Sequence, residues 1–471
     1  MADASTNGTD RNVTHASEGP LDPSVGNLFK AYDIRGIVPQ ELDPEIAYRI
    51  GRALVVFLAP DQVVVGRDMR VSGPALSAAL IDGIRDQGAD VVDVGMVSTD
   101  ALYFAVGKYG FPAGVMITAS HNPAAYNGFK ICREEARALS MDSGIAEIRD
   151  LVLAGDFPSA ARRGDLTTRD ILSAYAEHVL GMIDPGRIKP LKIAVDAGNG
   201  MAGALIPRVF ETLPCEIVPL YFELDGTFPN HEANPIEPEN IRDLQRTVVE
   251  EQCDLGVAFD GDADRMFLID ENGEFIGGDM TTAMVALQML KTHPGSAIVY
   301  NLICSRTVPE IISEHGGRPI RSRVGHSFIK AVMREEDAIF GGEHSGHFYF
   351  RDNWYADSGL IALLTVLQLV SDEDQPLSQI LEPIDTRFRS GEINSEVSDI
   401  GAVMRRVEET YAARGAEIDH LDGLTVGFDT WWFNLRPSNT QPLLRLNVEA
   451  EDKATLEEKT AEVLQLIRGQ A

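Results

Sequence analysis

The sequence repeatedly alternates short apolar runs with amphipathic helical stretches, and this alternation restricts the fold more than any other feature. Residues 62–65 and 113–118 are apolar runs typical of buried strands, and residues 75–86 have the apolar spacing of an amphipathic helix. The same rhythm starts again near residues 191 and 277. Strands that alternate with helices favour a mostly parallel sheet covered by helices. The pattern therefore predicts an α/β fold. Whether its blocks are structural repeats stays open, because no sequence repeat is visible.

The chain is too long for one domain, because 471 residues exceed the ~150 residues of an ordinary domain about threefold. The N-terminal segment lacks hydrophobic periodicity and predicts a disordered tail. The C-terminal segment differs from the rest, because strands near 431–435 and 443–448 lie between helices over 400–414 and 452–468. We therefore divide the chain into a tail (1–24), three α/β domains (25–165, 166–273 and 274–384) and a small α+β domain (385–471).

Net charge excludes several classes of partner. Lys and Arg number 41 and Asp and Glu number 72, a net charge of −31, which argues against binding of nucleic acid or anionic lipid. No apolar run reaches the ~18 residues of a membrane span, and the N-terminus lacks the apolar core of a secretory signal. Four cysteines without CxxC spacing fit a reducing compartment. We expect a cytoplasmic protein that can still hold a local basic pocket for a small phosphate.

Three acidic residues, Asp260, Asp262 and Asp264, alternate with small residues between two strand-like runs, 254–259 and 266–269. Their carboxylates can converge on one hard cation, Mg²⁺ or Ca²⁺, if the backbone turns. A solvated acidic turn is the competing interpretation in a chain with 72 acidic residues. A calcium-binding EF-hand is disfavoured, because strands flank the segment and an arginine occupies the position where that loop needs glycine.

A second motif, Ser120-His121, follows the apolar run that ends at residue 118. A serine at a strand end in a polar turn is well placed to be a nucleophile or a phosphate carrier. The alternative is an ordinary turn closed by Asn122 and Pro123. No GxSxG motif is present, so a hydrolase triad is not indicated. Lys130 follows a turn that can fold it back toward Ser120.

The third motif is the polar, glycine-flanked segment 342–347. Its glycines let Glu343, Ser345 and His347 point into a cleft, where they can hydrogen-bond sugar hydroxyls. The spacing of His344 and His347 suggests zinc only weakly, since no cysteine or third histidine is nearby. A glycine-rich surface loop is the competing interpretation.

The fourth motif places Arg436, Ser438, Asn439 and Thr440 close together between two prolines. An arginine can bind a phosphate through two parallel hydrogen bonds, and hydroxyl and backbone N–H groups supply further donors. The segment therefore predicts a phosphate cradle, with a capping turn between strands as the alternative.

These four motifs, in this order, strongly resemble those of the α-D-phosphohexomutase superfamily, and more closely its phosphomannomutase/phosphoglucomutase branch. The resemblance runs from Phe29 to Pro442 and includes segments 65–68, 228–231 and 325–330. It implies four domains in a heart shape around a central cleft, three similar α/β domains and a small C-terminal α+β domain. It also implies reversible transfer of phosphate between O1 and O6 of a hexose.

The resemblance assigns roles to residues of this chain. Ser120 becomes the phosphoryl carrier and, with Asp260, Asp262 and Asp264, a ligand of Mg²⁺. A hexose 1,6-bisphosphate is the intermediate and also the activator that primes the enzyme. The implied catalytic set is Arg35, Ser120, His121, Lys130, Arg265 and His326, with Lys130, His326 and His347 as alternative acid–base groups. The implied substrate-binding set is Tyr32, Glu343, Ser345, His347, Arg436, Ser438, Asn439 and Thr440.

The predicted function is a phosphomannomutase that interconverts mannose 1-phosphate and mannose 6-phosphate and also acts on glucose phosphates. A phosphoglucosamine mutase, a catalytically silent sugar-phosphate-binding paralogue and, as the weakest interpretation, a calcium-binding structural module are the alternatives. Expected partners are small hexose phosphates, without nucleic acid or membrane, for a monomer or dimer. One departure stands out: Ile303 occupies a position where many relatives carry a substrate-contacting lysine, and Arg306 or Arg323 is a candidate substitute.

Overall fold

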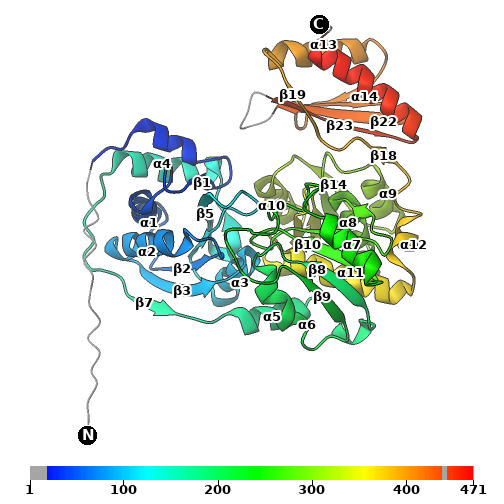
Figure 1. Ribbon diagram of the computed structural model, residues 1–471. Helices are drawn as coiled ribbons and strands as arrows, with labels where there is room; N and C mark the ends of the chain where they lie inside the picture. The colour runs from blue at the N-terminus through cyan, green and yellow to red at the C-terminus, as the bar shows by residue number, and fades with distance from the viewer. Residues whose placement is uncertain (1–18, 438–442, 470–471) are drawn as a thin grey trace.

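The computed structural model describes residues 19–437 and 443–469, which form four β-sheets and the helices around them (Figure 1). The first sheet has seven strands: β1 (Ile34–Ile37), β2 (Gln62–Arg67), β3 (Asp90–Met96), β4 (Ala113–Ile117), β5 (Tyr126–Arg133), β6 (Arg137–Ala138) and β7 (Leu166–Thr168). β7 pairs with β3, so this sheet extends beyond residue 165, the predicted domain boundary. The helix that follows β7 covers Leu172–Leu180.

The second and third sheets have five strands each and repeat the topology of the first. They comprise β8 (Lys192–Asp196), β9 (Glu216–Leu220), β10 (Leu255–Phe259), β11 (Met266–Ile269) and β12 (Phe275–Ile276), and then β13 (Ala297–Asn301), β14 (Arg318–Ser322), β15 (Phe340–Gly342), β16 (Phe348–Phe350) and β17 (Ala356–Asp357). In all three sheets, three parallel strands are followed by one antiparallel strand, which is β5, β11 or β16. The three domains are therefore structural repeats.

Helices cover these sheets: α1 (Pro44–Leu58), α2 (Gly73–Asp86), α3 (Thr99–Tyr109), α4 (Ile145–Ala154), α5 (Leu172–Leu180), α6 (Ala202–Phe210), α7 (Arg242–Glu250), α8 (Gly278–Thr292), α9 (Thr307–Glu314), α10 (His326–Glu335), α11 (Gly359–Glu373) and α12 (Leu377–Leu381). One apolar cluster runs from Val64 to Ile384 and includes buried residues of all three repeats. Burial of apolar surface is the main source of folding free energy, so this shared cluster holds the three domains in one body.

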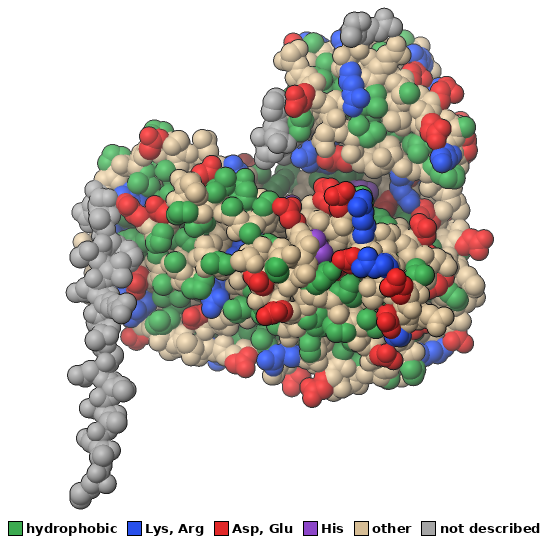
Figure 2. Space-filling view, in the orientation of Figure 1, with side chains coloured by type: hydrophobic (Ala, Val, Ile, Leu, Met, Phe, Trp, Pro, Cys, Tyr) green, Lys and Arg blue, Asp and Glu red, His purple; other side chains and the backbone are tan. Residues whose placement is uncertain are grey.

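The fourth sheet is antiparallel throughout and contains β18 (Phe388–Arg389), β19 (Ile393–Glu396), β20 (Glu417–Asp419), β21 (Leu424–Gly427), β22 (Trp431–Pro437) and β23 (Leu443–Ala450). Helices α13 (Ile400–Ala412) and α14 (Lys453–Arg468) pack on it around a separate apolar cluster. This domain lies at the top of the view in Figure 1 and contacts the third domain through Arg306, which donates to the carbonyl of Phe428. The surface is hollowed between it and the first domain (Figure 2). The expected architecture, three α/β domains and an α+β domain, is confirmed.

The structure corrects the prediction for residues 19–24, which belong to the first domain rather than to a tail. The N–H of Leu21 donates to the carbonyl of Leu153 at 2.9 Å. The buried Arg49 donates to the carbonyl of Gly19 at 2.7 Å. The tail prediction for residues 1–18 concerns residues outside the described part of the chain. Within the described ranges, no helix is long and apolar enough to cross a membrane.

Candidate active site

The Ser120, Asp260 and Glu343 motifs occupy equivalent positions in the three repeats. Each follows the last parallel strand, β4, β10 or β15, and precedes the antiparallel strand that comes next. The first two loops meet where the Ser120 hydroxyl donates to Asp260 Oδ2 at 2.7 Å. The second and third meet where Arg265 and His347 form an isolated β-bridge. Three motifs that are far apart in the sequence therefore form one site.

Ser120 is held in a strained backbone conformation. Its φ of 50° lies in the left-handed region, which costs a non-glycine residue roughly 1–3 kcal/mol. Two contacts hold the residue there: its N–H donates to Thr118 Oγ1 at 2.9 Å, and the buried Arg70 donates to its carbonyl at 2.8 Å. Arg70 also donates to the carbonyls of Asn122 and Pro123, at 2.6 and 2.8 Å. The loop is thus built around one arginine, which fixes the direction of the Ser120 hydroxyl.

The acidic triad Asp260, Asp262 and Asp264 is buried, with exposed fractions of 0%, 0% and 1%. Each residue offers a carboxylate oxygen within 4.8 Å of the other two. Asp262 Oδ1 and Asp264 Oδ1 are buried without any hydrogen-bond donor from the described residues, a costly arrangement unless a cation completes it. All the potential ligand atoms are carboxylate oxygens, so these residues fit a hard cation such as Mg²⁺. Burial excludes the solvated acidic turn, and the flanking strands exclude an EF-hand.

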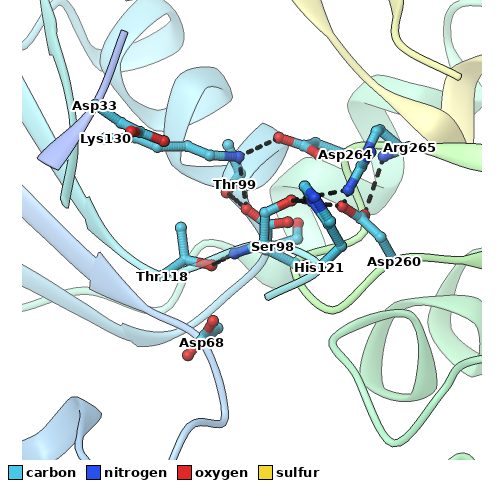
Figure 3. A network of polar contacts seen from close by, with 12 residues as sticks. Asp33, Asp68, Ser98, Thr99, Thr118, His121, Lys130, Asp260, Asp264 and Arg265 are labelled. Carbon is cyan, nitrogen blue, oxygen red and sulfur yellow. Dashed lines mark hydrogen bonds and ion pairs between the residues drawn. The ribbon is translucent and has the colours of Figure 1, made fainter. Parts of the chain in front are cut away.

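Two cations face the triad, and Figure 3 shows Lys130 directed toward Asp264 and Arg265 directed toward Asp260. The ammonium of Lys130 donates to Asp262 at 2.7 Å and also to Asp264. Burial opposes its charge, but these carboxylates hold the Lys130 pKa well above its usual value. Arg265 donates to Asp260 Oδ2 at 2.9 Å and to the Ser120 hydroxyl at 3.3 Å. Both cations stay charged and can neutralise a phosphoryl group on Ser120.

Arg35 and His121 complete the surroundings of Ser120. Arg35 donates to Asn122 Oδ1 at 2.5 Å and forms an ion pair with Asp33. His121 Nδ1 lies 3.3 Å from the Ser120 hydroxyl. Burial, followed by the charges of Arg265 and Arg35, lowers the His121 pKa well below its usual value. His121 is therefore neutral and acts as a hydrogen-bonding group rather than as a cation.

A cavity of 240 Å³ opens beside Ser120 and is lined from the first three domains. Its lining includes all six residues of the predicted catalytic set, which are Arg35, Ser120, His121, Lys130, Arg265 and His326. It also includes Tyr32 and His347 of the predicted substrate-binding set and the predicted metal ligand Asp264. The Tyr32 ring packs edge-on against His326, with ring centroids 4.9 Å apart. Burial, followed by the charge of Lys330, lowers the His326 pKa well below its usual value, so this imidazole is neutral.

The third-domain loop presents Glu343 and His347. Glu343 is 2% exposed, and its carboxylate accepts hydrogen bonds from Tyr349, from Asn301 at 3.3 Å and from the Ser345 hydroxyl at 3.4 Å. These contacts hold the carboxylate in one orientation. His344 belongs to neither metal-ligating group found among the described residues, so zinc at this pair of histidines has no support. The competing interpretation of segment 342–347, a glycine-rich surface loop, is excluded because Glu343 is buried.

The fourth domain contributes Arg436, at the end of β22. Its guanidinium donates to Glu392 Oε2 at 3.0 Å, and its side chain is 11% exposed. Burial is the main cause that raises the Tyr32 pKa, and the negative charge of Glu343 raises it further. The positive charge of Arg436 acts in the opposite direction and lowers the Tyr32 pKa. Arg436 is therefore close enough to influence the cleft electrostatically. The other predicted phosphate ligands, Ser438, Asn439 and Thr440, lie outside the described residues.

Several residues of the site have no predicted role in the sequence motifs. Asp357 lines the cavity, and Lys330 donates a hydrogen bond to Asp357. The Thr99 hydroxyl donates to Asp262. Lys330 lies within the resembling segment 325–330, where the motif assigns it no role, and neither Asp357 nor Thr99 lies in any of the four motifs. Burial and long-range contacts identify these residues, and no local pattern indicates them.

The two substitutes considered for the missing lysine at Ile303 differ in the structure. Arg306 donates to the carbonyl of Phe428 at 2.7 Å and so joins the third domain to the fourth. Arg323 is exposed and stacks over the Phe328 ring, 4.4 Å from its centroid. The charge of Arg323 also acts on Tyr32, which lines the cavity. Arg323 is thus the better placed of the two.

Four family models match the chain in order. They are the α/β/α domains I, II and III of phosphoglucomutase/phosphomannomutase, over residues 26–159, 173–273 and 277–387, and the C-terminal domain, over 392–466. A serine beside a buried acidic triad and two cations suits phosphoryl transfer, which depends on positioning and on stabilisation of charge. The protein is an intramolecular phosphotransferase of the phosphohexomutase class. The chain belongs to the phosphoglucomutase/phosphomannomutase family.

Individual proteins agree with this assignment. The chain is 43% identical to a phosphomannomutase of Salmonella montevideo over 448 residues, which are 93% of this chain and 98% of the relative. It is 43% identical over 443 residues to a protein of Xanthomonas campestris named phosphohexose mutases, covering 94% and 99% of the two chains. A crystal structure of a phosphoglucomutase/phosphomannomutase family protein from Burkholderia thailandensis superposes with a TM-score of 0.86 at 35% identity, covering 94% and 98%.

Proposed function

We propose that the enzyme is a phosphomannomutase that interconverts mannose 1-phosphate and mannose 6-phosphate and also accepts glucose phosphates. The observation that carries the proposal is the contact of the Ser120 hydroxyl with Asp260 and Arg265, at 2.7 and 3.3 Å. It places a nucleophile against both a cation site and a fixed guanidinium. The relatives named phosphomannomutase support mannose phosphates as the preferred substrates.

Ser120 carries the phosphoryl group between the two halves of the reaction. In one half, a sugar hydroxyl oxygen forms a bond to phosphorus while the Ser120 Oγ–P bond breaks, and its electron pair moves to Oγ. Arg265 stabilises the charge on Oγ, and Lys130 stabilises the charge on the equatorial oxygens. Asp260, Asp262 and Asp264 would hold Mg²⁺, which supplies further charge neutralisation when bound.

His347 is the group that accepts the proton of the attacking hydroxyl. Lys130 is unsuited because two carboxylates keep its ammonium protonated. The ring of His326 packs against Tyr32, whereas His347 has its Nδ1 fixed 2.9 Å from Asp357 and lines the cavity. The proton goes to His347 Nε2 and returns to Oγ or to a sugar oxygen in the reverse half.

The fourth domain clamps the phosphate that is not being transferred. Arg436 exchanges Glu392 for this phosphate, and Ser438, Asn439 and Thr440 supply the other contacts. A hexose 1,6-bisphosphate forms after the first transfer and turns over in the cleft, so the clamp must release it and bind it again. The fourth domain has its own apolar cluster, which allows it to move as a unit. The same bisphosphate phosphorylates Ser120 and so activates the enzyme.

The test compares turnover of mannose 1-phosphate, glucose 1-phosphate and glucosamine 1-phosphate, each with Mg²⁺ and a trace of hexose 1,6-bisphosphate. We expect turnover of mannose phosphate to be fastest and to vanish with EDTA and in Ser120→Ala. Faster turnover of glucosamine phosphate would favour a phosphoglucosamine mutase. No turnover by a folded protein that mass spectrometry shows to be phosphorylated on Ser120 would contradict the proposal and favour a silent sugar-phosphate-binding protein.

A further inference from the structure

A second polar network includes two residues of the cavity lining, His347 and Asp357, and joins three elements of the third domain. His347 precedes β16, and its Nδ1 lies 2.9 Å from Asp357 Oδ2. The other oxygen of Asp357 accepts a hydrogen bond from the ammonium of Lys330, on α10, at 2.7 Å. The exposed fractions of these side chains are 20% for His347, 5% for Asp357 and 4% for Lys330. None of the four sequence motifs assigns a role to Asp357 or to Lys330.

We propose that Asp357, with its charge balanced by Lys330, is a positioning residue that fixes the tautomer and ring orientation of His347. In this arrangement Nδ1 carries the hydrogen and donates it to Asp357, and Nε2 presents its lone pair to the cleft. The inference rests on the proposed function, in which His347 Nε2 accepts the proton of the sugar hydroxyl.

The hydrogen-bonding capacity of the groups dictates this tautomer. A neutral imidazole has one N–H donor and one acceptor nitrogen, and a carboxylate only accepts. Contact with Asp357 therefore requires the hydrogen on Nδ1 of His347. Without Asp357 as acceptor, the imidazole of His347 can adopt either tautomer and can also rotate. Only one pairing of tautomer and ring orientation leaves a lone pair directed at the substrate.

Lys330 explains how a buried carboxylate stays ionised and therefore remains an acceptor. A carboxylate in an apolar interior becomes neutral unless a partner holds its charge. The Lys330 ammonium is itself held over two aromatic rings, 4.7 Å from the centroid of Tyr103 and 5.4 Å from that of Tyr349. Tyr103 lies on α3 of the first domain, so the network also spans the contact between the first and third domains.

A metal site is the competing interpretation, because Asp264, His347 and Asp357 offer ligand atoms within 4.8 Å of one another. Both oxygens of Asp357 already have partners, the Lys330 ammonium on Oδ1 and His347 Nδ1 on Oδ2. A metal ion would have to displace one of them. The positioning role uses the contacts as they stand, and we favour it for that reason.

The test is Asp357→Asn, which keeps the shape of the side chain but can donate to His347. We expect kcat to fall about 10²- to 10⁴-fold, the range of general acid–base catalysis, with KM changed less than about threefold. Lys330→Arg, which keeps the charge, should retain most of the activity, whereas Lys330→Met should resemble Asp357→Asn. Asp196→Asn is the matched control: Asp196 is 1% exposed, lies 3.0 Å from His231 outside the cavity lining, and its loss should leave kcat within about threefold.

The tautomer of His347 can be observed by spectroscopy. This observation tests the positioning role of Asp357 separately from loss of folding and from failure of the proposed function. Burial opposes the charge of His347, but the contact with Asp357 raises its pKa, so ¹⁵N shifts of labelled histidines are recorded at alkaline pH, where the imidazole is neutral. With His347 assigned through His347→Gln, they should show the Nδ1–H tautomer in the wild type and a mixture in Asp357→Asn. A wild-type Nε2–H tautomer overturns the inference without any need for a variant. Unchanged kcat in folded Asp357→Asn also overturns it. In enzyme already saturated with Mg²⁺, micromolar zinc that removes the Nδ1–H signal of His347 overturns it in favour of a metal site. If the wild type turns over no hexose phosphate, the proposed function fails, and the tautomer still decides the positioning role.

Discussion

The hydroxyl of Ser120 lies 2.7 Å from Asp260 Oδ2, although 140 residues separate the two in the chain. The first residue follows β4 in the first domain, and the second follows β10 in the second domain. Their contact depends on the apolar cluster shared by the first three domains, because a shift between two domains would move Ser120 away from the acidic triad. The distance between Ser120 and Asp260 therefore depends on how the domains of this enzyme pack.

The buried triad predicts how the enzyme responds to loss of a ligand. Asp262→Asn should weaken Mg²⁺ binding by at least about 10-fold, the smallest loss usual when a group that only orients a metal ligand is changed, because here one of three anionic ligand oxygens becomes neutral. The melting temperature in EDTA should change little, since the substitution also relieves repulsion: burial and the charge of Asp262 raise the Asp264 pKa to about 7. Turnover against Mg²⁺ concentration and melting with and without Mg²⁺ are the measurements. An unchanged Mg²⁺ dependence would remove Asp262 from the ligand set.

Arg265 contacts two groups at once, through Nε to Asp260 and through Nη2 to Ser120. Lysine has a single ammonium group and does not reproduce this fork. Arg265→Lys should therefore lower kcat about 100-fold, comparable to loss of one preorganised donor, with little change in KM. Steady-state kinetics and the rate of Ser120 phosphorylation by hexose 1,6-bisphosphate measure this. Arg246→Lys, in an exposed pair with Asp243, is the control and should change kcat less than twofold.

Helices α1 and α2 pack so closely that their glycines limit the fold. A Cβ atom on Gly83 would lie 2.0 Å from the carbonyl oxygen of Tyr48. Gly83→Ala should destabilise the protein by about 3 kcal/mol, because the backbone itself has to move. Gly401→Ala places the same atom on α13 with its nearest neighbour 3.5 Å away and should stabilise by up to about 1 kcal/mol. Denaturant unfolding measures both, and equal effects would contradict the packing argument.

The buried Asp100 should make the free energy of unfolding depend on pH. Burial raises its pKa to about 6, despite hydrogen bonds from Ser98, Tyr175 and Ser358. Between its unfolded value of 3.8 and about 6, the folded state binds more proton than the unfolded state, so this group lowers stability as pH rises through that window.

The measurement is the free energy of unfolding of the wild type and of Asp100→Asn at pH 5 and pH 7. The wild type should lose on the order of 1–2 kcal/mol relative to the variant as the pH rises. A constant difference between the two proteins would mean that the carboxylate is ionised throughout this range.

Much of the chemistry is accessible from the amino-acid sequence. Residue types and spacing single out Ser120, Lys130, Arg265 and His347, and all four line the same cavity. Strand β11 and helix α13 start at the residues that apolar periodicity indicates. Periodicity and residue type are local properties, so a linear pattern records them directly.

Burial and convergence required the tertiary structure. The sequence leaves the acidic triad open between a cation site and a solvated turn, and only the 0–1% exposure of its carboxylates decides the question. It gives no sign that Asp357 holds His347 or that Arg306 joins the third domain to the fourth. These relationships arise when strands and helices pack across domains. Each depends on many distant residues at once, and no short segment of the chain encodes any of them.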